Sequence, residues 1–255
     1  MIKLSCIMPF LNSHEIVRRQ ILHFHRMEIP DEVEIIFMDD GSDPPIVIPQ
    51  PPKNFRLIPT NDFRPWTSSI ARNTGAKLAE GEYLLLTDGD YILTQQALEH
   101  CLEYRGDRLG FRRQFGVLDE DGRFTQDKAT LMAWGLPEYR FHSRKGLYFS
   151  PHPNNFVMRK QLFFDMGGYN EERILSRGYP QREDSLFKRT YRRWVNEGKI
   201  KEDAFPRATI YMFPNGQFCG GDVDYNPFGL FHTLTRKTPD NYWYLHVRYP
   251  KEQAT

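Results

Sequence analysis

Short apolar runs and an amphipathic stretch alternate at the start of the chain. Residues 3–8 and 33–38 are apolar runs of strand length, and residues 14–27 carry apolar side chains at helical spacing. Strand, helix and strand of these lengths predict a βαβ unit, in which the two strands are parallel. Either Asn12 or Ser13 is expected to cap the helix.

The apolar run at residues 83–86 predicts a central strand. It lies between Gly81 and Gly89 and is too short for a helix. Since both of its faces are apolar, we expect it in the middle of a sheet that helices cover. Pro9 is expected to stop the first strand, because proline has no N–H to donate to a ladder.

The rest of the pattern extends this alternation. Further strands are predicted at residues 55–58, 155–158 and 209–213, and further helices at residues 66–79, 94–104 (capped by Thr94), 160–166 and 183–196. Prolines at residues 44–52 predict an extended connector, and residues 109–124 predict an antiparallel hairpin. These elements define an α/β fold with a Rossmann-like, mixed and mostly parallel sheet flanked by helices, followed by a small irregular C-terminal extension.

Composition narrows the class of protein. The 255 residues include 34 basic and 33 acidic side chains, which excludes a generic nucleic-acid binder. Cys6, Cys101 and Cys219 have no metal-binding spacing and favour a reduced, cytoplasmic location, with a peripheral position at the inner membrane face left open. No secretory signal and no transmembrane segment are expected. The aromatic content of 14% leans weakly towards a carbohydrate partner.

Three acidic pairs stand at the ends or starts of predicted elements: Asp39 and Asp40, Asp88 and Asp90, and Glu183 and Asp184. The first two pairs follow strands, and ligands bind at the carboxyl ends of strands in open α/β sheets. Asp88 and Asp90 suit a hard divalent cation that also holds phosphate oxygens, and Gly89 lets the backbone approach a bound group. An ordinary surface turn is the alternative.

Two further features have structural explanations. Glu183 and Asp184 open a helix, where carboxylates also complement the helix dipole. His14, His23 and His25 do not have the spacing of a helical metal pair, so we expect them at surface or capping positions.

Four sequence blocks, in this order, resemble the family 2 glycosyltransferases of the GT-A fold. The blocks are Ser-Cys-Ile-Met-Pro-Phe-Leu-Asn at residues 5–12, Glu-Ile-Ile-Phe-Met-Asp-Asp-Gly-Ser at residues 34–42, Ala-Arg-Asn-Thr-Gly at residues 71–75 leading to Asp88-Gly89-Asp90, and Phe-Val-Met-Arg at residues 156–159 leading through Gly-Gly-Tyr-Asn-Glu to Glu183-Asp184. Each block alone is weak, but together they cover roughly residues 2–195.

The resemblance implies an enzyme that moves a sugar from a nucleotide sugar, most simply a UDP-sugar, to a hydroxyl of a carbohydrate or glycoconjugate acceptor. Transfer would be metal-dependent, inverting and of the hexosyltransferase type, as in polysaccharide biosynthesis. It implies one GT-A domain at residues 1–213, with a nucleotide-binding half at about 1–104 and an acceptor-binding half at about 105–213. Residues 214–255 would pack on the same domain.

The resemblance also implies roles for single residues. On the donor side these are Pro9, Phe10, Asn12, Asp40 (on the uracil edge), Arg72 (near the diphosphate), Asp88 and Gly89. Asp88 and Asp90 would hold Mn²⁺ or Mg²⁺, with Asp90 the more direct ligand. His232 is the candidate third ligand, and a packed histidine in an aromatic tail is the open alternative.

On the acceptor side, the resemblance implies that Asp184 is the general base and that Glu183 beside it helps to hold the acceptor. Gly168 and Tyr179 are the expected acceptor-binding residues. Two other functions remain open. A sugar-nucleotide pyrophosphorylase would need a glycine- and arginine-rich loop that residues 9–12 lack, and a non-catalytic binding module would not need all three acidic pairs.

Overall fold

The computed structural model describes residues 1–62, 67–142, 146–149, 152–172, 183–201, 208–214, 235–237 and 243–245. Its main sheet has six strands in the order β3 (Phe55–Pro59), β2 (Val33–Asp39), β1 (Leu4–Phe10), β4 (Tyr83–Leu86), β11 (Phe156–Arg159) and β6 (Arg108–Gly110). The first four are mutually parallel, whereas β11 is antiparallel to both of its neighbours. The mixed, mostly parallel sheet is therefore confirmed, with β4 inside it.

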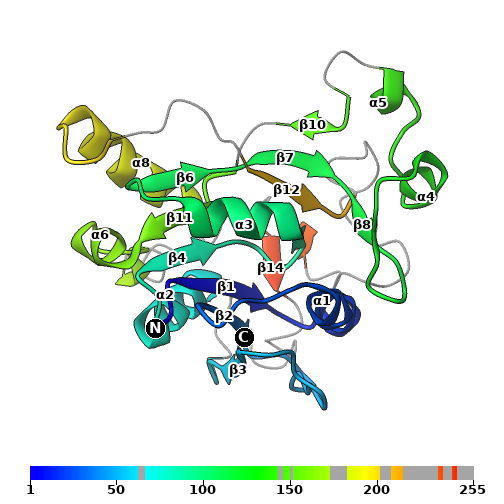
Figure 1. Ribbon diagram of the computed structural model, residues 1–255, viewed down its shortest axis with the longest axis horizontal. Coiled ribbons are helices and arrows are strands. Elements are labelled where there is room, and N and C mark those ends of the chain that lie inside the picture. Colours follow the sequence, from blue (N-terminus) through cyan, green and yellow to red (C-terminus); the bar gives the residue numbers. More distant parts are fainter. Residues whose placement is uncertain are drawn as a thin grey trace.

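Helices cover both faces of this sheet (Figure 1). On one face, α1 (His14–Arg26) and α3 (Gln95–Glu103) pack against the side chains that β1 directs there, among them Met8. On the other face lie α2 (Ser68–Leu78), α6 (Lys160–Asp165) and α8 (Glu183–Asn196), which pack against residues such as Ile7. Neighbouring residues of β1 thus enter opposite cores, as expected for a strand that is apolar on both faces.

A second sheet closes the structure beside the end of β4. It has four strands in the order β10 (Tyr148–Phe149), β7 (Arg112–Phe115), β12 (Thr209–Met212) and β5 (Tyr91–Ile92). Smaller elements are the predicted hairpin of β8 (Val117–Leu118) and β9 (Phe124–Thr125), helices α4 (Lys128–Ala133) and α5 (Tyr139–His142), and a ribbon of β13 (Thr235–Lys237) and β14 (Trp243–Leu245). The apolar run that begins at Leu109 is therefore divided between the two sheets.

Local predictions at two strand and helix ends were wrong. Pro9 does not stop β1, which continues to Phe10. On one side β1 pairs with β4 only as far as Ile7, so the missing N–H of Pro9 breaks no ladder there. Ser13 precedes α1 but makes no side-chain cap, since its hydroxyl donates to the Leu11 carbonyl oxygen instead. Thr94 does cap α3, accepting the N–H of Ala97.

One face of α1 holds the segment that follows β4. The side-chain amide of Gln20 donates to the carbonyl oxygens of Gly89, at 3.2 Å, and Tyr91, at 2.6 Å. His23 is buried, which corrects the expected surface position, and its ring nitrogens lie 2.8 and 3.2 Å from the carbonyl oxygens of Leu93 and Gly122. These contacts fix the segment that carries the predicted carboxylates against the helix.

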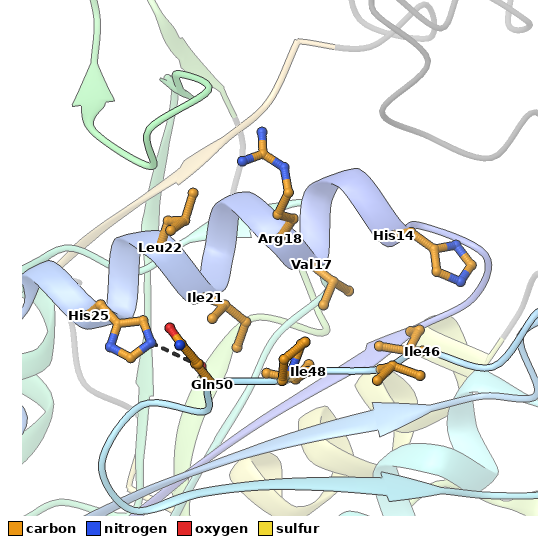
Figure 2. Close-up of a pocket in the computed structure, with 11 residues that line it drawn as sticks. His14, Val17, Arg18, Ile21, Leu22, His25, Ile46, Ile48 and Gln50 are labelled. Carbon is orange, nitrogen blue, oxygen red and sulfur yellow. Dashed lines mark hydrogen bonds between the residues drawn. The ribbon is translucent and has the colours of Figure 1, made fainter.

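The opposite face of α1 borders a groove of about 260 Å³ (Figure 2). Val17 and Ile21 point from the helix towards Ile46 and Ile48 of the proline-rich connector. At the two ends of the groove, His14 and His25 contact backbone carbonyl oxygens of the connector, at 2.9 and 3.0 Å. The connector is therefore fastened to this face of α1.

None of the helices in the described ranges is both long and apolar enough to cross a bilayer.

Candidate active site

The loop after β4 carries Asp88 and Asp90 at the carboxyl end of a central strand. Its glycine packs against the end of β1: a Cβ on Gly89 would lie 2.5 Å from the Phe10 ring and 2.9 Å from the Pro9 carbonyl oxygen. Only glycine allows this approach. The requirement at this position thus comes from packing on β1, in addition to any contact with a ligand.

Asn155, just before β11, holds the start of this loop. Its side-chain oxygen accepts the Thr87 hydroxyl at 2.7 Å and the Asp88 N–H at 3.4 Å. Thr87 and Asn155 are both buried, so the hydrogen bond between them lies in the protein interior. Asp88 is therefore positioned by the antiparallel neighbour of its own strand.

Asp88 lies at the centre of a chain of ionisable side chains. Its Oδ1 accepts a close hydrogen bond from the buried guanidinium of Arg72 on α2. Its Oδ2 lies 3.6 Å from Nδ1 of His152, and Nε2 of the same ring lies 4.0 Å from Oδ2 of Asp184 on α8. The structure thus brings Arg72, Asp88 and Asp184 together and adds His152 between the two carboxylates.

Asp90 is half-buried and its charge is poorly compensated. Burial, and then the charge of neighbouring Asp88, raise the pKa of Asp90 from 3.8 to about 7, although Arg113 and Arg72 oppose the shift. Arg113 is itself buried on β7 and donates to the Tyr91 hydroxyl. A second buried arginine therefore faces this acidic loop.

The carboxylate of Asp40 is buried among hydroxyl groups beyond the end of β2. Its Oδ1 accepts hydrogen bonds from Thr67 at 2.7 Å and from Thr60 at 3.5 Å. Asp39 instead has a structural role, since its two oxygens accept the N–H groups of Ser42 and Ile46 at 2.9 Å each. Only Asp40 of this pair remains a candidate for ligand contact.

Asn12 braces the same turn from the end of β1. Its N–H donates to the Ser42 hydroxyl at 2.8 Å, and its side-chain oxygen accepts the Asp43 N–H at 2.6 Å. Phe10, in contrast, places its ring in the core, 4.5 Å from that of Phe37. The structure thus places only the backbone of Phe10 next to the Asp40 turn, through a hydrogen bond from the Asp40 N–H.

Asn73 on α2 clamps the predicted Gly-Gly-Tyr turn. Its side chain accepts the Tyr169 N–H at 3.0 Å and donates to the Tyr169 carbonyl oxygen at 2.8 Å. Gly168 has φ = +58°, and a Cβ there would lie 2.8 Å from Asn73 Oδ1. Glycine is therefore required by both the backbone conformation and the clamp.

Three predicted residues have no described side chain to compare. Tyr179 and His232 lie outside the described residues, and of Glu183 only the backbone, at the start of α8, is described. Their roles stay predictions.

Several residues of the site were missed from the sequence: His152, Asn155, Asn73 and Arg113. Asn73 lay inside the Ala-Arg-Asn-Thr-Gly block, so its neighbour Arg72 was a usable signal. His152 and Asn155 belong to a Pro-His-Pro-Asn-Asn stretch directly before a predicted strand, a position where site residues are common. Nothing local distinguished Arg113 from other arginines.

The carboxylates are compatible with a divalent cation shared with a ligand. In the described part of the chain, no three His, Cys, Asp or Glu side chains are grouped closely enough to form a metal site alone. Mg²⁺, however, is usually held by one or two carboxylates together with substrate phosphates. The raised pKa of Asp90 beside Asp88 is the electrostatic condition that a cation would relieve. Asp88 and Asp90 therefore fit such a cation.

Comparison with known proteins defines the class. Residues 5–166 match Glycosyl transferase family 2, and the chain belongs to this family. None of the curated proteins with which the chain was compared matches it.

Solved structures show the same fold. The crystal structure of S. aureus TarS 1-349 superposes with a TM-score of 0.50 at 20% identity, over 83% of this chain and 60% of that one. The same TarS fragment in complex with UDP gives a TM-score of 0.50 at 20% identity, over 85% and 62% of the two chains, and its complex with UDP-GlcNAc gives 0.50 at 18% identity, over 84% and 59%. The chain thus spans about three fifths of these structures. Together with the family match, they establish a GT-A-like α/β fold.

Proposed function

We propose that the chain transfers a sugar from a UDP-sugar to an acceptor hydroxyl with inversion of configuration at the anomeric carbon. One observation carries the proposal: Asp88 and Asp184, from segments almost a hundred residues apart, meet on either side of His152. An inverting displacement needs a leaving-group end and a base end on opposite sides of the sugar. The two carboxylates supply one candidate for each end.

The donor would occupy the edge where β1, β2 and β4 end. TarS, which shares the fold, was crystallised with UDP and with UDP-GlcNAc, which supports a uridine nucleotide as the donor. Asp40, buried beside Thr67, would accept a hydrogen bond from the uracil N–H. Arg72 would turn from Asp88 towards the diphosphate, because a guanidinium forms paired hydrogen bonds to phosphate oxygens.

Asp88 and Asp90 would hold Mn²⁺ or Mg²⁺ against the diphosphate. The cation would supply Lewis-acid stabilisation of the charge on the departing nucleoside diphosphate. Two other residues keep this loop in place. Gly89 allows the loop to contact β1, and Gln20 donates hydrogen bonds to carbonyl oxygens of the loop and of Tyr91.

Asp184 would act as the general base at its Oδ2. Its Oδ1 already accepts the Ser185 N–H at 2.6 Å, so Oδ2 is the oxygen directed at the site. As the acceptor oxygen bonds to the anomeric carbon, the carbon–oxygen bond to the diphosphate breaks and its electron pair leaves with UDP. The acceptor proton passes to Asp184 Oδ2. Glu183 and Gly168 would line the acceptor side.

The test is turnover of UDP-GlcNAc, as transfer or as slow hydrolysis, with and without Mn²⁺. We expect activity only with the cation, and loss of most turnover in Asp90→Ala. The matched control is Asp31→Ala, which removes an exposed carboxylate that pairs with Lys53. Calorimetry with UDP and Mn²⁺ provides a second measurement. UDP binding without any turnover of several UDP-sugars would instead support a non-catalytic binding module.

A further inference from the structure

His152 lies between the two ends of the proposed reaction. Its ring is about one third exposed and stands between Asp88 Oδ2, 3.6 Å from Nδ1, and Asp184 Oδ2, 4.0 Å from Nε2. Both distances exceed those of a direct hydrogen bond. A shift of about 1 Å at Asp184, or one bridging water, would be enough to connect Nε2 to the carboxylate.

The backbone that follows His152 defines which ring nitrogen carries the hydrogen. The N–H of Asn154 donates to His152 Nδ1 at 3.3 Å. A nitrogen that accepts a hydrogen bond has its lone pair available, so the neutral ring carries its hydrogen on Nε2. That N–H faces Asp184 and not Asp88.

The segment that carries His152 is held in place by buried neighbours. The Asn155 N–H donates to the His152 carbonyl oxygen at 3.2 Å, and the side chain of Asn155 binds Thr87 and the Asp88 N–H. Asn154, also buried, accepts the Tyr169 hydroxyl at 3.1 Å. One short segment, residues 152–155, therefore positions both the loop of Asp88 and the His152 ring whose Nε2–H faces Asp184.

We propose that His152 is a positioning residue for Asp184: its Nε2–H holds Oδ2 of the base and thereby sets the carboxylate's direction towards the acceptor hydroxyl. The inference rests on the proposed transfer reaction. A carboxylate oxygen has two lone pairs, so Oδ2 can accept this N–H and still take the acceptor proton. Without His152, the Asp184 side chain would keep its bond to Ser185 but would lose the restraint on its second oxygen.

The test uses three variants of the full chain. His152→Phe keeps a flat ring but removes the N–H, His152→Gln keeps a donor of similar reach, and His142→Phe is the matched control at an exposed histidine. We expect His152→Phe to lower kcat for transfer by about 10–100-fold, the usual contribution of a partner that orients a site ligand. The KM for the donor and the Kd for UDP should change less than about twofold, and His152→Gln should recover most of kcat.

A double mutant separates positioning from a general structural effect. In an Asp184→Asn background, His152→Phe should cause no further loss of kcat, because the group that it positions has already lost its function. Equal and independent losses in both backgrounds would overturn the inference. If the phenyl ring prevents folding, as shown by a lower melting temperature, His152→Ala takes its place in the same series.

The two proposals fail in different ways. If Asp184→Asn lowers transfer but His152→Phe transfers at the wild-type rate, only the role of His152 is overturned. If Asp184→Asn itself transfers at the wild-type rate, both the proposed base and the positioning role are wrong.

Discussion

The two faces of α1 border regions of opposite character. One face lines the groove of about 260 Å³, whose walls are mainly aliphatic and whose two histidines contact connector carbonyl oxygens. The other face, through Gln20, holds the loop of Asp88 and Asp90, where like charges are crowded. The contacts around the groove fasten the connector to α1, whereas the crowded charges of the loop are typical of a site for a charged ligand. In the described residues, the crowding of like charges marks the candidate site more clearly than the groove does.

The largest effect on transfer should come from replacing Asp184, the proposed general base. Asp184→Asn changes shape very little but removes the proposed proton acceptor, so transfer should fall by about 10²–10⁴-fold while UDP binding persists. Rates of transfer and NMR of the product's anomeric configuration provide the measurement. Ile48→Ala, in the groove, is the control and should transfer at the wild-type rate. A retained configuration would contradict an inverting mechanism.

The reverse pattern is expected for the groove. Ile21 of α1 is buried on the side that faces the connector. Ile21→Ala should therefore lower the free energy of unfolding by about 2–5 kcal/mol. Urea unfolding measures this loss. Turnover per folded molecule should stay at the wild-type level. A variant that is fully stable but inactive would mean that the groove belongs to the site, and the contrast between the two faces would then be wrong.

Donor binding should show a smaller effect at Asp40. With the proposed contact to uracil, Asp40→Asn would lose a charge-assisted hydrogen bond to the nucleobase and should weaken UDP binding by about 1.5–3 kcal/mol. Isothermal titration calorimetry measures this change, with exposed Asp43→Asn as the neighbouring control. Unchanged affinity would place the nucleobase elsewhere.

The smallest effect concerns His23, on the face of α1 that holds the loop. Burial lowers the pKa of His23 below 6.5, although hydrogen bonds to Leu93 and Gly122 partly oppose the shift. Below pH 6.5 the unfolded chain therefore binds a proton that the folded chain resists, and the free energy of unfolding should decrease as the pH falls. His23→Gln should flatten this part of the stability profile. Chemical denaturation at pH 7.5 and pH 5.5 provides the comparison.

Local pattern was enough to predict most of the main sheet. The apolar run at residues 83–86 became β4 with the predicted bounds, and the strand–helix–strand rhythm became parallel β1 and β2. These elements are encoded by neighbouring residues. The error at Pro9 has a different origin, because whether a proline interrupts a ladder depends on where the partner strand β4 ends.

The site was only partly predictable for the same reason. Asp88, Asp90 and Asp184 stand out because carboxylates at element ends are visible in the sequence. His152 and Arg113 gain their significance only from contacts across the fold, with Asp184 and with Tyr91. No sequence spacing predicts such pairs, because the fold of the intervening chain determines whether the two residues meet.

The late strand β12 has a consequence for how the molecule is made and divided. Its Tyr211 and Met212 pair with Ile92 and Tyr91, and the Phe213 N–H donates to the carbonyl oxygen of Asp90 at 3.2 Å. During synthesis, β12 emerges roughly 120 residues after the acidic loop. The pairing beside this loop therefore forms only after most of the chain has been made. A fragment cut at residue 166, where the family match ends, would contain the proposed donor-side residues from Pro9 to Asp90 but would lack β12, the strand that pairs beside this loop.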